Sequence, residues 1–272
     1  MQYKNIQGLE VPEIGLGTYK LHDRECSQIV RKALDIGYRH IDTAQMYKNE
    51  QAIAEALNVS NVPREDIFLS TKIWHTNLEA DDVLQSTEET LRQLDTPYVD
   101  LLMIHWPNDQ YDLRATIESM LVLRDQGKAM NIGVSNFPLH LLTKVKEEIR
   151  APIFCNQVEF HPFIDQLDLL DYAIENDIMI TAYSPLAQGK VMENEDLQEI
   201  AEKYGKSPAQ ISLRWLIEQE NVVAIPKASS EEHLRENFDV FDFYLEDEDF
   251  ERIDQLEKSL RLVNPSFAPD WG

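Results

Sequence analysis

The sequence predicts an α/β fold: a single (β/α)8 TIM barrel that forms one domain over residues 1–272. Three observations predict it. Short apolar runs rich in β-branched and aromatic residues recur along the chain, segments with helical periodicity separate them, and no stretch rich in Gly, Ser or Pro divides the chain. An apolar content of 43% in 272 residues is enough for one large core.

Eight predicted strands are spaced along the chain as in successive βαβ units. Eight parallel strands are also the number that closes a barrel of this class. The runs are Ile14–Tyr19, Tyr38–Thr43, Ile67–Ile73, Val99–Trp106, Asn131–Phe137, Phe154–Phe160, Ile178–Tyr183 and Val222–Lys227. A short strand pair from Tyr3 to Val11 precedes them as an N-terminal β-hairpin.

Helices are predicted between the strands from apolar periodicity and from start and stop residues. Gly37 and Gly127 end two of them, while Pro138, Asp165 and the Ser207-Pro208 pair begin later ones. After the last helix, an irregular C-terminal tail contains Pro265 and Pro269. The helices with both ends assigned are Asp23–Ile36, Ala80–Leu94, Asp112–Gln126, Glu193–Tyr204, Pro208–Glu218, Ser230–Phe238 and Glu246–Leu256.

The charge of the chain argues against several classes of partner. It has 49 acidic and 25 basic residues, which gives a net charge of −24. Such a surface repels nucleic acid and anionic membranes, so neither is expected as a partner. No apolar run approaches the roughly 18 residues of a membrane span, and the first residues lack an export signal, so a cytoplasmic protein is expected.

The cysteines and the surface pattern lead to two further expectations. Cys26 and Cys155 are far apart and form no C-x-x-C pair, so both are expected to be reduced, without a metal site. No apolar seam indicates a dimer, so a monomer is the default expectation.

Titratable residues lie at the ends of the predicted strands, where barrels of this class carry their active sites. Asp42, Lys72 and His105 end the second, third and fourth strands, and Tyr47 lies in the loop after the second. Singly, each has an ordinary explanation: a helix cap, a solvated ammonium, a core histidine or a surface aromatic. Their joint position on one rim favours a catalytic site.

The chemistry that suits these four residues is protonation of one oxygen atom. A free phenol has a pKa of about 10, and a neighbouring ammonium lowers it, so Lys72 is expected to make Tyr47 a general acid. Asp42 is expected to hold Lys72 charged and in place, and His105 to orient a substrate oxygen by a hydrogen bond. This site, with no activated Ser or Cys nucleophile, suits reduction of a carbonyl by hydride transfer.

Five motifs in order, at residues 37–44, 71–74, 102–107, 132–137 and 225–227, resemble the aldo-keto reductase family over essentially the whole chain. Residues 261–271 resemble the tail of the B type of prokaryotic 2,5-diketo-D-gluconic acid reductases. The family's catalytic tetrad matches Asp42, Tyr47, Lys72 and His105. The resemblance also implies a nicotinamide cofactor, normally NADPH (NADP+ when oxidised), bound without a Rossmann fold.

The same resemblance implies the cofactor contacts. Tyr183 is expected to stack on the nicotinamide ring, and Ser135, Asn136 and Gln157 to bind its carboxamide. Thr18 is expected to face the cofactor. The loop that crosses the pyrophosphate is expected to contain Ser184, Leu186 and Gln188. The adenine edge is expected to be held by Glu236 and Asn237. The Gly15-Leu16-Gly17-Thr18 segment is a weak match to a dinucleotide fingerprint and is interpreted as the tight end of the first strand.

At the 2′-phosphate the chain departs from the family pattern. The family has Lys-Ser and an Arg six residues after the Lys, whereas here Ala228 follows Lys227 and His233 occupies the arginine position. A histidine lacks the bidentate fork of arginine and is only partly charged at neutral pH. Weakened selectivity for NADPH over NADH is therefore expected. The residues expected to retain some of it are Lys227, Ser229, Ser230 and Arg235.

Tyr19, Trp74, Trp106 and Trp271 are the aromatic residues expected at the mouth of the substrate pocket. An aromatic pocket with a short tail suits small aldehydes, keto-sugars and α-dicarbonyl compounds. Two alternatives stay open: a cofactor-binding regulatory module with little turnover, and a Schiff-base lyase that uses Lys72 as its nucleophile.

Overall fold

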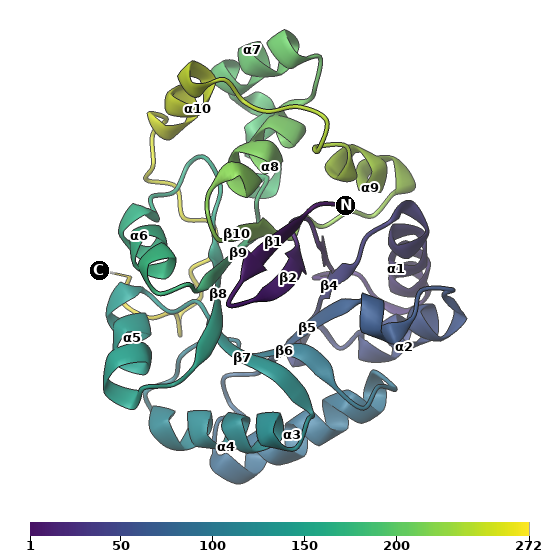
Figure 1. Ribbon diagram of the computed structural model, residues 1–272, viewed down its shortest axis with the longest axis vertical. Coiled ribbons are helices and arrows are strands. Elements are labelled where there is room, and N and C mark those ends of the chain that lie inside the picture. Colours follow the sequence, from purple (N-terminus) through teal and green to yellow (C-terminus); the bar gives the residue numbers. More distant parts are fainter. Residues whose placement is uncertain (272) are drawn as a thin grey trace.

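The computed structural model describes residues 1–271 and confirms the (β/α)8 barrel (Figure 1). The parallel strands follow the order β10-β9-β8-β7-β6-β5-β4-β3. Their bounds are β3 Leu16–Gly17, β4 His40–Asp42, β5 Phe68–Ile73, β6 Val99–Ile104, β7 Ala129–Ser135, β8 Ile153–Glu159, β9 Met179–Tyr183 and β10 Val222–Ala224. Gly272, the last residue of the predicted domain, lies outside the described residues.

The barrel closes along a seam between the first and last strands of this order. Ile14 forms a parallel bridge with Ala224, and the Gly17 amide donates to the carbonyl of Pro226 at 3.1 Å. A Cβ atom on Gly17 would lie 2.7 Å from the carbonyl oxygen of Ile225, so the close approach requires glycine. The G-x-G pair therefore serves closure of the barrel, in agreement with its interpretation as the tight end of a strand.

Helices surround the strands on the outside (Figure 1). One helix begins at Asp23 and another runs from Pro208 to Glu218, both as predicted. Ser207 and Gln210 form a capping box at the start of the second. The helices are α1 Asp23–Ile36, α2 Glu50–Val59, α3 Ala80–Gln93, α4 Leu113–Asp125, α5 Leu139–Thr143, α6 Leu167–Glu175, α7 Glu195–Tyr204, α8 Pro208–Glu218, α9 Glu231–Phe238 and α10 Asp247–Asp254. A π-helical segment covers Lys144–Ile149, and 3-10 segments cover Gln45–Tyr47, Arg64–Asp66 and Ala187–Glu193.

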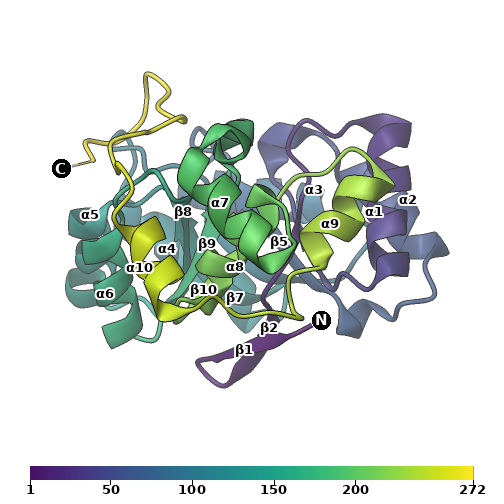
Figure 2. The same cartoon turned by 90° about the horizontal axis from the view of Figure 1, so that it is seen from above.

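The predicted N-terminal hairpin consists of β1 (Tyr3–Ile6) and β2 (Leu9–Pro12). Ile6 and Val11 are fully buried and pack with inward-facing residues of the barrel strands, among them Phe68 and Phe154. The hairpin thereby closes one end of the barrel. Figure 2 shows it on the side opposite to the C-terminal tail.

The C-terminal tail follows α10 and runs along the other end of the barrel (Figure 2). Its start pairs with the segment after β8, because the Leu260 amide donates to the carbonyl of Phe163 at 2.9 Å and Ser259 bridges Ile164. Within residues 1–271, no helix is both long enough and apolar enough to cross a membrane.

Candidate active site

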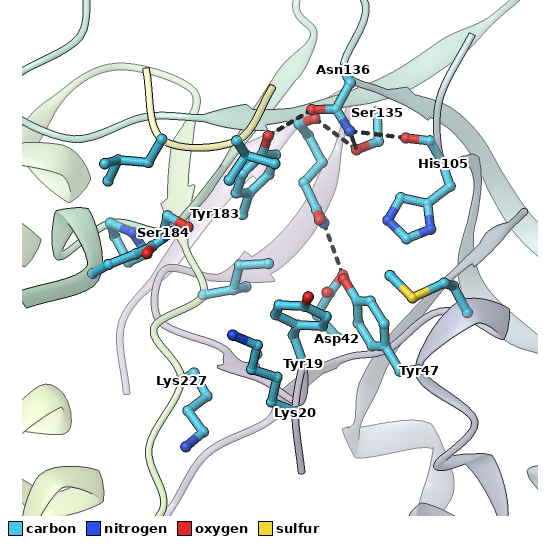
Figure 3. Close-up of a pocket in the computed structure, with 18 of the residues that line it drawn as sticks. Tyr19, Lys20, Asp42, Tyr47, His105, Ser135, Asn136, Tyr183, Ser184 and Lys227 are labelled. Carbon is cyan, nitrogen blue, oxygen red and sulfur yellow. Dashed lines mark hydrogen bonds between the residues drawn. The ribbon is translucent and has the colours of Figure 1, made fainter. Parts of the chain in front are cut away.

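A cavity of about 770 Å³ opens at the carboxyl ends of the strands (Figure 3). Every barrel strand contributes to its lining near or just after its carboxyl end, which is the position where this fold places its sites. These residues are Gly17, Asp42, Trp74, His105, Ser135, Gln157, Tyr183 and Ile225. The tail contributes the outer wall with Leu262, Val263, Asn264, Pro265 and Phe267.

A buried ion pair lies beneath the cavity. The Lys72 ammonium donates to Asp42 Oδ1 at 2.6 Å and to the carbonyl of Thr43 at 2.8 Å, and Lys72 is fully buried. Burial lowers the pKa of Lys72, while Asp42 opposes that shift. Ser70 and Gln157 donate to the other oxygen of Asp42 at 2.7 and 2.8 Å. Three hydrogen bonds besides the one within the pair therefore stabilise it, as a buried pair requires.

Tyr47 lies between this ion pair and the cavity. The Lys72 ammonium is 5.1 Å from the centroid of the Tyr47 ring, and the ring is partly exposed to the cavity. The expectation that Lys72 lowers the pKa of Tyr47 differs from what the structure gives. Desolvation, with Asp42 as the next cause, raises the pKa well above its usual value. The positive charge of Lys72 is offset by Asp42, so the phenol is protonated at neutral pH.

His105 lies beside Tyr47, with ring centroids 5.7 Å apart and a nearly perpendicular arrangement. Burial, followed by the charges of Lys72 and His75, lowers its pKa well below 6.5. The imidazole is therefore neutral at pH 7. Its Nδ1 atom is buried and has no hydrogen-bond partner among the described residues. The ring itself lines the cavity, and a neutral imidazole there can orient a bound oxygen.

Four residues beside the ion pair carry hydrogen-bonding groups that suit a carboxamide. The Tyr183 hydroxyl donates to Asn136 Oδ1 at 2.8 Å, and Asn136 Nδ2 donates to the carbonyl of His105 at 2.9 Å (Figure 3). Ser135 donates to the carbonyl of Gln157 at 2.9 Å. These bonds fix the Tyr183 ring against the cavity. A nicotinamide therefore fits this end, since it needs a flat partner and amide contacts.

Positive charge enters the cavity at two points despite the acidic surface. Lys20 and Lys227 line it and lie on the same side in Figure 3. The loop 184–189 faces them, and Ser184, Gln188 and Gly189 have left-handed backbone angles, with φ of 49°, 53° and 96°. Ala187 also has a positive φ, 47°, and the Ala187 and Gly189 amides already donate to the carbonyls of Ser184 and Leu186, each at 2.8 Å. The donors that line the cavity and suit an anion are the two ammonium groups and the side chains of Ser184 and Gln188. The donor set therefore fits a pyrophosphate.

Of the predicted 2′-phosphate residues, Lys227 lines the cavity, whereas Ser229, Ser230, His233 and Arg235 lie outside it, before and on α9. Ser229 and His233 are exposed, and the Ser230 hydroxyl accepts the His233 amide at 3.2 Å as the helix cap. Arg235, the expected reserve of positive charge, forms an ion pair with Glu231 at 2.8 Å. Glu231 also contacts Lys32 at 3.4 Å.

The aromatic residues at the mouth form a connected group. Phe267 stacks on His75 with centroids 4.2 Å apart, and it meets Trp74 and Trp106 edge-on at 5.7 and 5.6 Å. Tyr19 lies 5.2 Å from Tyr47 by ring centroids. Small carbonyl compounds suit such a lining.

The structure brings most of the predicted site residues together and places others nearby. Lys72 and Thr18 lie behind the cavity; the Thr18 hydroxyl donates to the carbonyl of Asp42 at 2.8 Å. Lys72 therefore offers no surface to a carbonyl carbon, which argues against a Schiff base. Trp271 packs 6.1 Å from Trp106 by ring centroids, at the outer edge. The predicted residues that line the cavity are Tyr19, Asp42, Tyr47, Trp74, His105, Trp106, Ser135, Asn136, Gln157, Tyr183, Ser184, Leu186, Gln188 and Lys227. Glu236 and Asn237 lie on α9.

Several lining residues were not predicted. Lys20 directly follows the predicted Thr18-Tyr19 pair, so its place at a strand end was a usable signal. No sequence signal indicated Met46, Phe267 or the segment 262–265, because their position depends on how loops far apart in the sequence fold over the rim.

Comparison with known proteins agrees with this geometry. The model of the "Aldo/keto reductase family" matches residues 13–258. The chain belongs to this family. It is 41% identical to a glyoxal reductase of Bacillus subtilis (strain 168) over 257 residues, which cover 94% of this chain and 92% of the relative. It is 38% identical to methylglyoxal reductase DkgB of Escherichia coli O157:H7, over 97% of this chain and 100% of the relative.

Solved structures resemble this aldo-keto reductase over nearly its full length. One, described as a candidate 2,5-diketo-D-gluconic acid reductase B, has a TM-score of 0.97 and 39% identity, with 100% of this chain and 98% of that chain covered. Another aldo-keto reductase, from a Medee basin deep-sea metagenome library, has a TM-score of 0.93 and 37% identity, with 98% and 99% covered. The protein is an enzyme, an NAD(P)H-dependent aldo-keto reductase.

Proposed function

We propose that this enzyme reduces small α-dicarbonyl compounds, aldehydes and keto-sugars to alcohols, with NADPH as the hydride donor and Tyr47 as the general acid. The observation that carries the proposal is the Asp42–Lys72 pair at 2.6 Å beneath Tyr47, with neutral His105 beside that ring. The names of the relatives, glyoxal and methylglyoxal reductases, support the substrate class.

The buried pair positions Tyr47 and prepares the site for negative charge. When bound, NADPH supplies the hydride, so the carbonyl oxygen gains negative charge and needs a proton. The protonated Tyr47 phenol supplies that proton. Lys72 stabilises the phenolate that results, in a recess where electrostatic interactions are stronger than in water. A raised pKa does not prevent this transfer, because an alkoxide is a stronger base than a phenolate.

His105 orients the carbonyl. A neutral imidazole can donate a hydrogen bond to the oxygen without adding a second positive charge beside Lys72. The aromatic walls, chiefly Trp74 and Trp106, exclude water from the reacting oxygen and contact the apolar part of the substrate. Together these groups favour one orientation of a small carbonyl compound.

The cofactor contacts follow from the same cavity. Tyr183 is the stacking partner of the nicotinamide, and Asn136 and Gln157 are the carboxamide partners. Gln157 is also bonded to Asp42 at 2.8 Å, so one side chain links the cofactor end to the catalytic pair. Lys20 and Lys227 supply the positive charge for the phosphates.

Selectivity for NADPH is expected to be weak. His233 replaces the arginine of the family pattern, and Arg235 is engaged by Glu231. We expect a preference for NADPH over NADH of less than about a thousandfold, which corresponds to about 4 kcal/mol. Titration of both cofactors against one dicarbonyl substrate measures it, and a larger preference would show that our interpretation of His233 is wrong.

The mechanism is tested by Tyr47→Phe, assayed with glyoxal and methylglyoxal. We expect kcat to fall by a factor of about a thousand or more, because the proton donor is lost. NADPH binding, followed by fluorescence quenching, should stay nearly unchanged. Tyr19→Phe is the matched control, since it removes a neighbouring phenol of the same cavity and should leave kcat within about twofold of the wild type. An unchanged kcat in Tyr47→Phe would exclude the mechanism.

A further inference from the structure

Glu159 is a buried carboxylate, fully shielded from solvent, that the mechanism does not use. It lies at the end of β8, two residues after Gln157. Its oxygens accept three hydrogen bonds: from the Leu262 amide at 2.7 Å, from the Val263 amide at 2.8 Å and from His161 Nε2 at 2.9 Å. Two of these donors belong to the C-terminal tail.

The hydrogen bonds identify Glu159 as an ionised acceptor. His161 is fully buried, and its Nδ1 accepts the Phe163 amide at 3.2 Å. The Nε2 atom of a neutral imidazole therefore carries the proton that is donated to Glu159. Burial alone would raise the pKa of Glu159, but the hydrogen bonds from His161 and the two tail amides outweigh it and hold the pKa below its usual value.

The two tail residues held by Glu159 begin the outer wall of the cavity. Leu262 and Val263 line it, and Phe267 then reaches the aromatic group at the mouth. The tail also closes on itself, because Trp271 Nε1 donates to Asn264 at 3.0 Å and the Arg261 guanidinium lies 3.8 Å from the Trp271 ring centroid. Beyond these residues the tail meets the barrel through aromatic contacts, those of Phe267 with His75 and of Trp271 with Trp106. Glu159 supplies the buried hydrogen bonds that hold the start of the wall.

We propose that Glu159 is a positioning residue for the substrate: it fixes the tail as the outer wall and so determines how tightly carbonyl compounds large enough to reach the tail are bound. The substrate part of this inference rests on the proposed function. Glu159 itself touches the tail rather than the substrate. A methyl-substituted dicarbonyl is too small to depend on the wall, whereas a phenyl group in the same position packs against Phe267.

The test uses Glu159→Gln, which keeps the shape of the side chain but places an NH2 group against N–H donors. We expect the KM for phenylglyoxal to rise about tenfold, which corresponds to about 1.4 kcal/mol. The KM for methylglyoxal and the kcat for both substrates should change by no more than about twofold. Glu257→Gln, the same charge change at an exposed residue of the tail, is the matched control and should behave as the wild type.

A double-mutant cycle shows whether Glu159 acts through the tail. Phe267→Ala removes the wall contact directly, so adding Glu159→Gln to it should raise the KM for phenylglyoxal no further. Fully additive effects would overturn the proposal, because they would mean that Glu159 acts on the substrate by another route, such as the neighbouring Tyr183.

Hydrogen exchange separates this inference from the proposed function. The Leu262 and Val263 amides should exchange at least about tenfold faster in Glu159→Gln, while amides inside β8 stay protected. If these two amides keep their protection, Glu159 does not hold the tail and the inference is wrong. If the two amides lose their protection but the KM for phenylglyoxal is unchanged, the tail does not determine how tightly this substrate binds, and the inference is again wrong. A wild-type enzyme that reduces no dicarbonyl would instead overturn the proposed function, while the exchange result still decides whether Glu159 holds the tail.

Discussion

Burial sets the charge of two histidines that interact with the Asp42–Lys72 pair, His40 and His105. His40 is fully buried, and burial lowers its pKa to about 4, against an opposing contribution from Asp42. The pKa of His105 is also lowered, and burial is the largest cause. Both imidazoles are neutral at pH 7, so Lys72 supplies the positive charge beside Tyr47. In the proposed mechanism, this ammonium beside one phenol makes Tyr47 the residue that changes charge.

The same pKa shifts predict a loss of stability in mild acid. The unfolded chain binds a proton at His40 near pH 6.5, whereas the folded protein resists it until about pH 4, so acid favours the unfolded state. Between pH 6.5 and 5, His40 alone should lower the free energy of unfolding by about 1.5 kcal/mol, and His105 adds to this loss. Urea unfolding across this range measures it. The loss should be smaller in His40→Asn and unchanged in His140→Asn, an exposed control; equal slopes in all three proteins would contradict the prediction.

Introducing an arginine at position 233 should increase the selectivity for NADPH over NADH. A guanidinium can form a bidentate contact that the exposed imidazole of His233 cannot. We expect His233→Arg to raise the ratio of kcat/KM for NADPH to that for NADH by about tenfold, since a charged hydrogen bond contributes about 1.5–3 kcal/mol. His140→Arg, the same change on the exposed side of α5, controls for the altered net charge. A ratio that rises equally in both variants would indicate a general charge effect.

Residues at strand ends could be located from the sequence, because the fold class fixes where those ends meet. Asp42, Lys72 and His105 were identified in this way. In the structure Asp42 and Lys72 form an ion pair, and His105 lines the cavity above it. The direction of the Tyr47 pKa could not be predicted. It depends on how strongly Asp42 neutralises Lys72 and on how much water the walls exclude, and both are properties of the folded site.

At the scale of elements, Asn49 connects the loops that carry the site. It is almost fully buried, accepts the Thr43 hydroxyl at 2.7 Å and donates to the carbonyls of Thr18 and Leu21, each at 3.0 Å. The loops after β3 and β4 are therefore joined by one side chain at the start of α2. Tyr47 lies two residues before it, so the position of the phenol depends on this junction.

Asn49→Ala should loosen that junction. It leaves the two carbonyls and the Thr43 hydroxyl without their partner, so we expect the free energy of unfolding to fall by about 1–3 kcal/mol. The kcat should fall as well, because Tyr47 is less well placed. Asn58→Ala is the control on the same helix, since its amide bonds Asp95 only at the surface. Thermal unfolding and steady-state kinetics test the pair, and a fully active Asn49→Ala enzyme would show that the junction does not position Tyr47.

Element boundaries could be predicted where local signals exist. Gly37, Gly127 and the Ser207-Pro208 pair mark helix ends that the structure confirms. Helix α2 was not predicted. Its first turn follows Asn49, whose side chain makes no cap hydrogen bond because its polar groups are used by neighbouring loops. The predicted first and last strands are longer than β3 and β10, since the residues around them bond across the seam instead of in a regular ladder.

At the scale of the whole molecule, closure of the barrel depends on Gly17. A methyl group there would meet the Ile225 carbonyl at 2.7 Å, and a backbone oxygen cannot move aside as a side chain can. We expect Gly17→Ala to lower the free energy of unfolding by about 1–3 kcal/mol and to weaken NADPH binding, because Gly17 also lines the cavity. Gly127→Ala, which meets nothing within 4 Å, should affect stability only, through its backbone angle. Unaltered stability and binding in Gly17→Ala would show that the seam tolerates the methyl group.

The alternation of strands and helices was sufficient to predict the barrel, because few architectures accommodate eight such units. The path of the tail was not predictable in the same way. It is fixed by contacts between residues far apart in the sequence, such as Glu159 with Val263 and His75 with Phe267. Irregular segments have no periodicity to indicate which surface they will cover.

The hairpin and the tail lie at opposite ends of the barrel, and this has a practical consequence for handling the protein (Figure 2). A tag, fusion partner or solid support joined before Met1 would sit beside the closed end, away from the cavity. The same addition joined after the tail would sit beside Phe267 and Trp271, at the entrance. An enzyme electrode or a purification fusion built on this chain should therefore be attached through its N-terminal side.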